Sequence, residues 1–244
     1  MSSRMLVGQH VEHNARRFAQ KIALQEAHAR QWTYAQLNAF ANQTAHALHA
    51  TGIRHGDKVG LVCDSRLEWV GLYVGIVKLG AVAVPPNTRL TPEEIAANLA
   101  ESDVRLLFGL EILSADTRAI LPDLRTIVID GTGADSLSTF LADQPTHDFE
   151  TRLQASDPNI ILFTGGTTGR AKGVVLTHEN LFWNSLDEII DTRMHEDDNT
   201  LLATPLHHSA ALNCWLLPHL YLGATATLLP KYSPEAMLRA IAAH

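Results

Sequence analysis

The stretch IILFTGGTTGRAKGVVLTHENL, residues 160–181, decides both the fold and the chemistry that this sequence predicts. Apolar residues 160–163 and 174–176 each predict a strand. Between them the chain changes to glycine and threonine with a single lysine, Lys172. Glycine lets a ligand approach the main chain closely, and backbone N–H groups that gather in one concavity bind phosphate. We therefore expect a phosphate-binding loop, although a hairpin turn with a solvated lysine would have a similar composition.

Two common phosphate-binding motifs do not fit this loop. In the P-loop pattern, glycine directly precedes lysine and a serine or threonine follows it. Here Arg170 and Ala171 separate Gly169 from Lys172, and Gly173 follows the lysine. The dinucleotide pattern G-x-G-x-x-G also fails, because the spacing is G-G-x-x-G. The loop belongs to another class.

Composition limits the kind of protein that this chain can be. It has 244 residues, of which 46% are hydrophobic and 18% charged, and this predicts a soluble globular chain with a sizeable core. The formal net charge of −7 argues against binding to nucleic acid or to an anionic membrane. It leaves room for ATP, which needs only a local positive site. Cys63 and Cys214 lie in apolar stretches, and we expect buried free thiols in a reducing cytoplasm.

No segment reads as a targeting or membrane-spanning element. Residues 1–20 lack the apolar run and cleavage site of a signal peptide. Residues 210–229 approach spanning length, but Asn213, Pro218 and His219 interrupt them. We expect a buried helix followed by a buried strand there, in a cytoplasmic protein without an integral membrane segment.

Strand and helix patterns alternate along the chain. Helices are expected over 33–52, over 65–80 with a capping box of Ser65 and Glu68, and over 91–103, where Thr91 and Glu94 form a second box. Strands are expected at 57–63, 81–86, 104–109, 125–130, 159–164, 173–178, 200–205 and 224–229. This alternation predicts an α/β fold with layered, largely parallel sheets flanked by helices.

The loop TGGTTGRAKG, followed by THEN, resembles the phosphate loop of the adenylate-forming superfamily. This superfamily contains acyl-CoA synthetases, adenylation domains of peptide synthetases, and luciferases. Its loop reads approximately [ST]-[SG]-G-[ST]-T-G-x-[PA]-K-G, with T-H-x-N a few residues later. Gly165 and Ala171 are its less usual options, and neither removes a group that contacts phosphate. The resemblance assigns the triphosphate and the departing pyrophosphate to Thr164, Gly165, Gly166, Thr167, Thr168, Gly169 and Lys172.

Other landmarks of the superfamily appear in the same order. WTYAQLN at 32–38, the stretch from GDKV to PEEI at 56–95, and DDNTLLATPLHHSA at 197–210 resemble its early segments. The resemblance implies that residues 1–244 are the incomplete N-terminal AMP-binding domain. The motifs on the adenine and ribose side, the hinge and the mobile C-terminal domain with its catalytic lysine are expected beyond this sequence.

The histidine of the third landmark, His208, resembles one that orients the carboxylate substrate, so the resemblance makes it catalytic together with Lys172. The residues alone leave two other interpretations open: the capped start of a helix after Pro205, and a metal pair with His207. We predict no metal site. The candidate acyl-pocket residues are His207, Ser209, Ala210 and Asn213.

Two further side chains invite a structural interpretation. Trp215 is expected in the core, and Lys78 is expected to extend from an apolar helix to reach water.

The resemblance implies an acid–thiol ligase that uses ATP, Mg²⁺ and coenzyme A. A carboxylic acid, fatty or related, would attack the α-phosphate of ATP, and coenzyme A would then attack the resulting acyl-adenylate. Because the expected adenine and ribose contacts have no candidates here, we expect the 244-residue chain to be inactive alone. An adenylation domain that loads a carrier protein, or a nucleotide-binding fragment without catalysis, are the alternatives.

Overall fold

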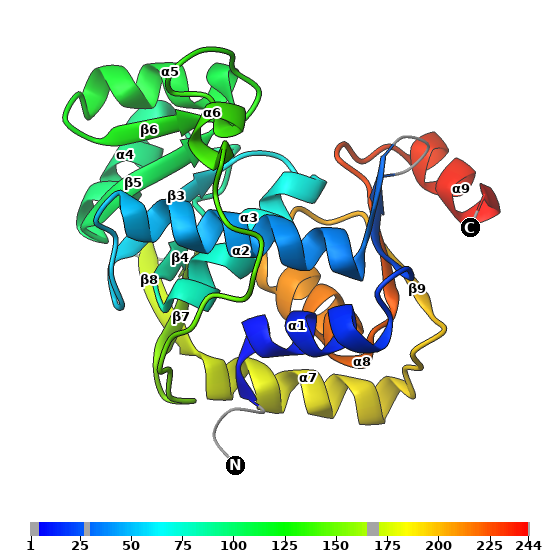
Figure 1. Cartoon of the computed structure of the whole chain (residues 1–244). Helices are drawn as coiled ribbons and strands as arrows, with labels where there is room; N and C mark the ends of the chain where they lie inside the picture. Colours follow the sequence, from blue (N-terminus) through cyan, green and yellow to red (C-terminus); the bar gives the residue numbers. More distant parts are fainter. Residues whose placement is uncertain (1–4, 27–29, 165–170, 244) are drawn as a thin grey trace.

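The computed structural model describes residues 5–26, 30–164 and 171–243. Within these ranges a six-stranded sheet has the strand order β6-β5-β3-β4-β7-β8 (Figure 1). Every neighbouring pair is parallel except β7 and β8, which form an antiparallel hairpin. The strands are β3 (Lys58–Val62), β4 (Val82–Val84), β5 (Val104–Gly109), β6 (Arg125–Val128), β7 (Pro158–Thr164) and β8 (Lys172–Thr177).

A second, four-stranded sheet has the order β2-β1-β10-β9 in the described residues. Its β1–β10 and β10–β9 pairs are parallel, and β1–β2 is antiparallel. Its strands are β1 (Ile22–Glu26), β2 (Gln31–Thr33), β9 (Asn199–Leu202) and β10 (Thr225–Leu228). The predicted α/β class with layered, largely parallel sheets flanked by helices is confirmed, and the sheets are two in number among the described residues. The strands β1 and β2 were not expected.

Helices cover and separate the two sheets. They are α1 (Val7–Arg17), α2 (Tyr34–Ala50), α3 (Leu67–Leu79), α4 (Pro92–Glu101), α5 (Glu111–Ile120), α6 (Leu137–Leu141), α7 (His178–Thr192), α8 (Leu217–Leu222), α9 (Pro234–Ala243) and the π-helix η2 (Ala210–Leu216). Helix α3 packs against α2 and contacts strands of both sheets. Helices α4 and α5 pack together against the other face of the six-stranded sheet (Figure 1).

Alternating side chains of the six-stranded sheet enter two cores. Val59 and Leu61 of β3 join the large core around α3, whereas Val62 joins a smaller core with Ile95 and Leu99 of α4. Successive side chains of a strand point to opposite faces, so a sheet covered on both faces needs continuous apolar strands. The apolar runs of the sequence therefore match the layers.

The ends of the helices follow the sequence signals in part. Thr91 caps α4, and Glu94 completes the capping box as predicted. The box predicted for Ser65 and Glu68 is wrong, because α3 has Arg66 at its N-cap and no side-chain cap. The Ser65 hydroxyl is used elsewhere, as an acceptor for a distant backbone N–H.

Lys78 does not reach water, which corrects the expectation for this residue. It is 6% exposed, and its Nζ donates to Asn38 Oδ1 at 2.7 Å and to Asn42 Oδ1 at 2.6 Å. Asp148 lies 3.7 Å away. Burial lowers the pKa of Lys78, while the charges of Asp148 and Glu12 oppose that change. The lysine therefore ties α2 and α3 to the long connection before β7.

Residues 210–229 form η2, α8 and β10, which confirms the predicted buried helix and strand. Trp215 is 43% exposed, so its predicted place in the core is wrong. Cys63 is buried as expected, whereas Cys214 is partly exposed. In the described part of the chain, no helix combines the length and apolarity that crossing a membrane requires.

Candidate functional site

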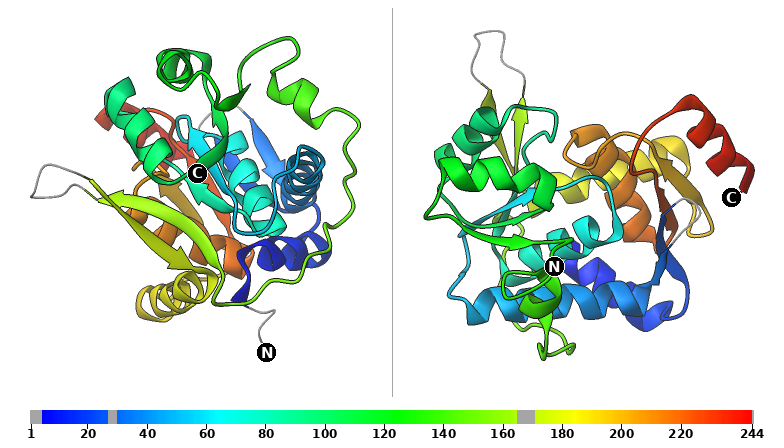
Figure 2. Two further views of the ribbon diagram at one scale, coloured as in Figure 1. Left: turned by 90° about the vertical axis from the view of Figure 1, so that its left-hand side faces the viewer. Right: turned by 90° about the horizontal axis from the view of Figure 1, so that it is seen from above.

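The β7–β8 hairpin carries the two described residues of the predicted phosphate loop. Thr164 and Lys172 are the last register pair before the connection between the strands. Both are exposed, and the Thr164 hydroxyl lies 3.4 Å from the carbonyl oxygen of Lys172, to which it donates. Figure 2 shows β7 and β8 extending together beyond the flanking helices. Gly165, Gly166, Thr167, Thr168 and Gly169 lie outside the described residues.

The segments that follow β3, β4 and β9 lie near one another at one edge of the six-stranded sheet. Neighbours β3, β4 and β7 are parallel, so their carboxyl ends share the edge where open α/β sheets bind ligands. The segment after β9 joins them, because the backbone N–H of Leu206 donates to Ser65 Oγ, after β3, at 3.1 Å. Arg89, after β4, acts electrostatically on His207. These segments outline the candidate site.

His208 occupies a turn just before η2. Its backbone N–H donates to the carbonyl of Pro205 at 3.0 Å, and its Nδ1 accepts from the N–H of Ala210 at 3.2 Å. His208 thus directly precedes Ser209, the N-cap residue of η2, and its ring contacts the backbone at the start of this helix. Because Nδ1 is an acceptor, the proton of the neutral ring lies on Nε2. The side chain is exposed and can present this N–H to a carboxylate.

The neighbouring His207 is half-buried. Burial lowers its pKa to about 4, with further contributions from the charges of His208 and Arg89. It is therefore neutral at physiological pH. Within the described ranges, no group of three or more His, Cys, Asp or Glu side chains could hold a metal ion.

The remaining candidates for the acyl pocket lie at the start of η2. Asn213 Nδ2 donates to Ser209 Oγ at 3.1 Å, and its backbone carbonyl accepts from Asn184 of α7 at 2.9 Å. Its Oδ1 is buried without a hydrogen-bond partner among the described residues. Ala210 is half-buried. π-helices are rare in proteins, but those that occur often lie at functional sites. The position of η2 therefore agrees with the position of the sequence motif.

The two groups of candidates extend from different sheets. Lys172 begins β8, whereas His208 follows β9, and α7 connects these two strands. No hydrogen bond or ion pair joins Lys172 to His208 in the described structure. The described candidates therefore form two separate groups. One group lies at the start of η2 and contains His207, His208, Ser209, Ala210 and Asn213. The other lies at the end of the β7–β8 hairpin and contains Thr164 and Lys172.

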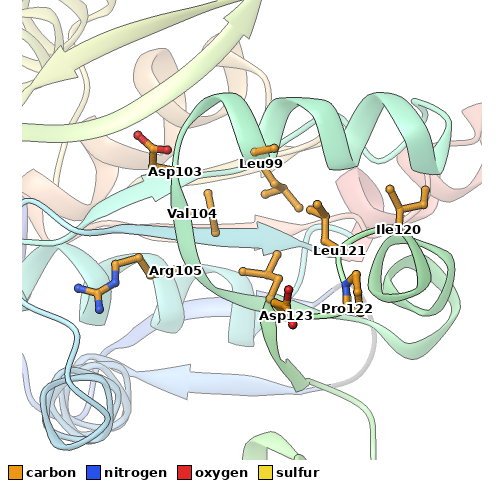
Figure 3. A pocket seen from close by; sticks show the side chains of 10 residues that line it. Leu99, Asp103, Val104, Arg105, Ile120, Leu121, Pro122 and Asp123 are labelled. Carbon is orange, nitrogen blue, oxygen red and sulfur yellow. The ribbon is translucent and has the colours of Figure 1, made fainter.

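One surface pocket lies away from both groups of candidates. It measures about 530 Å³ and is lined by residues of α4, α5, the start of β5 and the segment just before β6, among them Leu99, Arg105 and Leu121 (Figure 3). Because β5 and β6 are parallel to β3, their starts lie at the edge opposite the candidate site. Arg105 is paired there with Asp57 at 2.9 Å. None of the predicted site residues that the structure describes lines this pocket.

Sequence reasoning missed Ser65, Arg89 and Asn184 as parts of this region. Ser65 and Arg89 each follow a predicted strand closely, and residues at the carboxyl ends of parallel strands are candidates for ligand sites. That position was the available signal for both. Asn184 gave no signal, because its partner is a backbone carbonyl 29 positions away.

Comparison with known proteins points in one direction. The family described as AMP-binding enzyme matches residues 11–244. The chain is 36% identical over 208 residues to the long-chain-fatty-acid–CoA ligase FadD13 of Mycobacterium tuberculosis. This alignment covers 82% of the chain and 40% of the relative. The chain is 34% identical over 209 residues to a feruloyl-CoA synthase of an Amycolatopsis species, covering 86% and 41%.

Solved structures agree with this result. The inhibitor-bound N-terminal domain of FACL13 from Mycobacterium tuberculosis has a TM-score of 0.88 and 30% identity, covering 99% of this chain and 60% of that one. ATP-bound MatB from Rhodopseudomonas palustris has a TM-score of 0.85 and 29% identity, covering 99% and 48%. The chain thus spans about two fifths of the curated relatives named above, which are 40% and 41% covered.

Proposed function

We propose that this chain, which belongs to the AMP-binding enzyme family, forms the N-terminal part of an ATP-dependent acyl-CoA synthetase. The observation that carries the proposal is the β7–β8 hairpin, which presents Thr164 and Lys172 side by side at the ends of a glycine-rich connection. A hydroxyl and an ammonium group suit phosphate oxygens. ATP bound to a structural relative, MatB, supports the choice of nucleotide.

The proposed reaction has two steps. A carboxylate oxygen attacks the α-phosphorus of ATP, the bond between the α-phosphorus and the bridging oxygen breaks, and pyrophosphate leaves. The thiolate of coenzyme A then attacks the acyl carbonyl, and AMP leaves. The first step leaves the total charge unchanged but shifts negative charge onto the departing pyrophosphate. Fixed positive groups and hydrogen-bond donors near the phosphates therefore favour this step.

We assign the residues as follows. Lys172, Thr164 and the connection with Gly165, Gly166, Thr167, Thr168 and Gly169 hold the triphosphate and the departing pyrophosphate. Mg²⁺ enters with ATP and neutralises the phosphates. His208 donates its Nε2–H to the carboxylate, a role that its exposed ring and its Nδ1 contact with Ala210 support.

The acid is proposed to be a fatty or related acyl acid. The names of the relatives, a long-chain-fatty-acid–CoA ligase and a feruloyl-CoA synthase, support aliphatic and aromatic carboxylates respectively. His207, Ser209, Ala210 and Asn213 are the proposed pocket residues from this chain. The cytoplasm is the proposed location, because it supplies ATP and coenzyme A.

We further propose that the 244 residues alone do not form thioesters. The limited coverage of the relatives supports this, because groups that bind adenine and ribose are proposed to lie in the remaining part. Without several polar contacts of about 1 kcal/mol each, ATP affinity should fall by orders of magnitude. Isothermal titration of the chain with Mg-ATP and a thioester assay test this. Micromolar affinity together with CoA-ester formation would contradict it.

A substrate screen of the full-length protein tests the main proposal. It would combine Mg-ATP with fatty acids of increasing length and with hydroxycinnamic acids, each with and without coenzyme A. We expect AMP and pyrophosphate to form in step with an acyl-CoA. Acyl transfer to a carrier protein but not to coenzyme A would favour the alternative of a carrier-loading domain. No AMP with any acid would contradict the proposal.

A further inference from the structure

The base of the β7–β8 hairpin, at the end opposite Thr164 and Lys172, contains an irregularity. Pro158 pairs with Thr177 and Ile160 with Leu176, so Asn159 is an extra residue in β7. Such a β-bulge bends its strand and often re-aims the segment that follows, next to active sites in particular. The side chain of Asn159 is fully buried.

Asn159 is the middle member of a chain of hydrogen bonds. Tyr73 Oη of α3 lies 2.6 Å from Asn159 Oδ1, and Asn159 Nδ2 lies 3.0 Å from His178 Nδ1, at the first residue of α7. The backbone N–H of Val7, in α1, reaches the same His178 nitrogen at 3.4 Å. Tyr73, Asn159 and His178 are each 0% exposed, so water cannot replace these contacts.

The Val7 contact assigns a direction to the protons of this relay. The Val7 backbone can only donate, so His178 Nδ1 is assigned as the acceptor and the ring proton to Nε2, which is buried without a hydrogen-bond partner among the described residues. Asn159 must then present its NH₂ group to His178, which leaves Oδ1 to accept from the Tyr73 hydroxyl. Burial lowers the pKa of His178 to about 4 and raises that of Tyr73, so both groups keep these protonation states at physiological pH.

The relay adds a polar anchor to the apolar packing of β7, whose Ile160 and Leu162 lie in the large core and whose Ile161 lies in the smaller one. In the described structure, β8 is the edge strand, and β7 is joined to β4 through the register pair of Ala83 and Ile160. The start of α7 is fastened to the turn before β7, because His178 N donates to Asp157 O and Glu179 N to Ala155 O. The relay therefore joins α3, β7, α7 and α1 at the point from which the hairpin extends.

A small rotation at this point would be amplified at the other end. From Asn159 to Thr164 the strand spans roughly 17 Å at about 3.3 Å per residue. A tilt of about 5° would move Thr164 and Lys172 by about 1.5 Å, and displacements of that size reduce catalysis strongly.

We propose that Asn159 and His178, held by Tyr73, are positioning residues that fix the orientation of the phosphate-binding end of the hairpin. The inference rests on the proposed function, since it takes the end with Thr164 and Lys172 to bind the phosphates of ATP. The relay touches no substrate and acts through the strand. Its loss weakens ATP binding without changing the site that holds the acid.

Two matched pairs of variants test this in the full-length protein. Asn159→Ala is compared with Asn14→Ala, whose buried side chain donates to Leu220 O at 2.8 Å. Tyr73→Phe is compared with Tyr34→Phe, whose buried hydroxyl donates to Ala224 O at 2.6 Å, the length of the Tyr73 bond. Each pair removes the same chemical group, once inside and once outside the relay. The tyrosine pair leaves almost no cavity and serves if Asn159→Ala fails to fold.

The readouts are the melting temperature, the Kd for Mg-ATP by titration, and KM values in ATP–pyrophosphate exchange. We expect both members of a pair to lower the melting temperature by similar amounts. Only the relay variants should raise both Kd and KM for Mg-ATP, by about ten-fold in Asn159→Ala and by about three-fold in Tyr73→Phe. KM for the acid should not change in either variant.

Equal Mg-ATP constants within each pair would overturn the inference. Because the titration needs no turnover, it also separates the two claims. A protein that binds Mg-ATP but shows no ATP–pyrophosphate exchange with any acid tested would contradict the proposed function. The ratios of Kd within each pair of variants would still decide the role of the relay. A full-length protein that binds no Mg-ATP would overturn both.

Discussion

Thr164 and Lys172 face each other as the last register pair of the β7–β8 hairpin, and the Thr164 hydroxyl donates to the backbone carbonyl of Lys172. The antiparallel pairing brings two residues that are separated by a glycine-rich connection to the same end of two strands. This leaves the side-chain ammonium group of Lys172 exposed and available to an anion.

Replacing Lys172 by alanine in the full-length enzyme should lower turnover by roughly ten- to hundred-fold. The reason is the loss of one charge-assisted hydrogen bond to phosphate, worth about 1.5–3 kcal/mol. Steady-state kinetics of AMP formation measure the effect, and the exposed Lys231→Ala serves as the control. Unchanged adenylation in Lys172→Ala would refute the assignment of the phosphate-binding loop.

His208→Ala should depress acyl-adenylate formation more than it depresses binding of Mg-ATP. If His208 guides the carboxylate, its removal leaves the phosphate contacts in place. Single-turnover adenylate formation and titration with Mg-ATP give the two quantities, and the exposed His195→Ala provides the control. Equal losses of both quantities would indicate that His208 acts only through its contact with the backbone at the start of η2.

Lys78→Met should destabilise the 244-residue chain by about 3–5 kcal/mol, the usual cost of breaking a buried charge network from one side. Asn38 and Asn42 would lose their donor, and Asp148 would lose its buried cation. Denaturant unfolding measures the free energy, with Lys231→Met on the surface as the control. A loss below about 1 kcal/mol would show that the network adds little to stability.

The stability of the fold should fall as the pH drops from 6.5 towards 4, in part because of His178. Burial lowers the pKa of this histidine in the folded chain from 6.5 to about 4. Between these values the unfolded chain binds the proton more readily, so acid favours unfolding; below about 4 the contribution no longer changes. The effect is on the order of 3 kcal/mol.

Unfolding free energies measured across this pH window check the sign and the residue. His178→Asn retains an acceptor near Nδ1 but cannot titrate, so its stability should depend less on pH than that of the wild type. The exposed His195→Asn should leave the pH dependence unchanged. A wild type whose stability is constant from pH 6.5 to 4 would contradict the prediction.

The sequence predicts what depends on neighbours along the chain. Thr91 and Glu94 form their capping box because both partners lie within one helical turn. Ser65 and Glu68 have the same spacing, yet Ser65 instead accepts from Leu206, 141 positions away. Lys78 appeared solvated because its partners Asn38 and Asp148 come from distant segments. Local signals thus predicted most elements, and long-range polar contacts had to come from the structure.

The candidate site divides in the same way. Its motifs indicated Lys172 and His208, because their spacing is local. The convergence of the segments after β3, β4 and β9 depends on sheet order, which pairs strands far apart in the chain. The exposed position of Trp215 likewise depends on the π-helix, whose wider turn rotates side chains away from the positions that α-helical spacing predicts.

The central claim is that a carboxylate attacks the α-phosphorus of ATP at this site. The most direct measurement supplies the full-length enzyme with an accepted acid whose carboxyl group carries heavy oxygen, and then analyses the AMP by mass spectrometry. Attack on the α-phosphorus predicts that AMP gains one labelled oxygen per turnover when the acyl group is transferred to coenzyme A. Unlabelled AMP, or labelled phosphate in its place, would contradict the account.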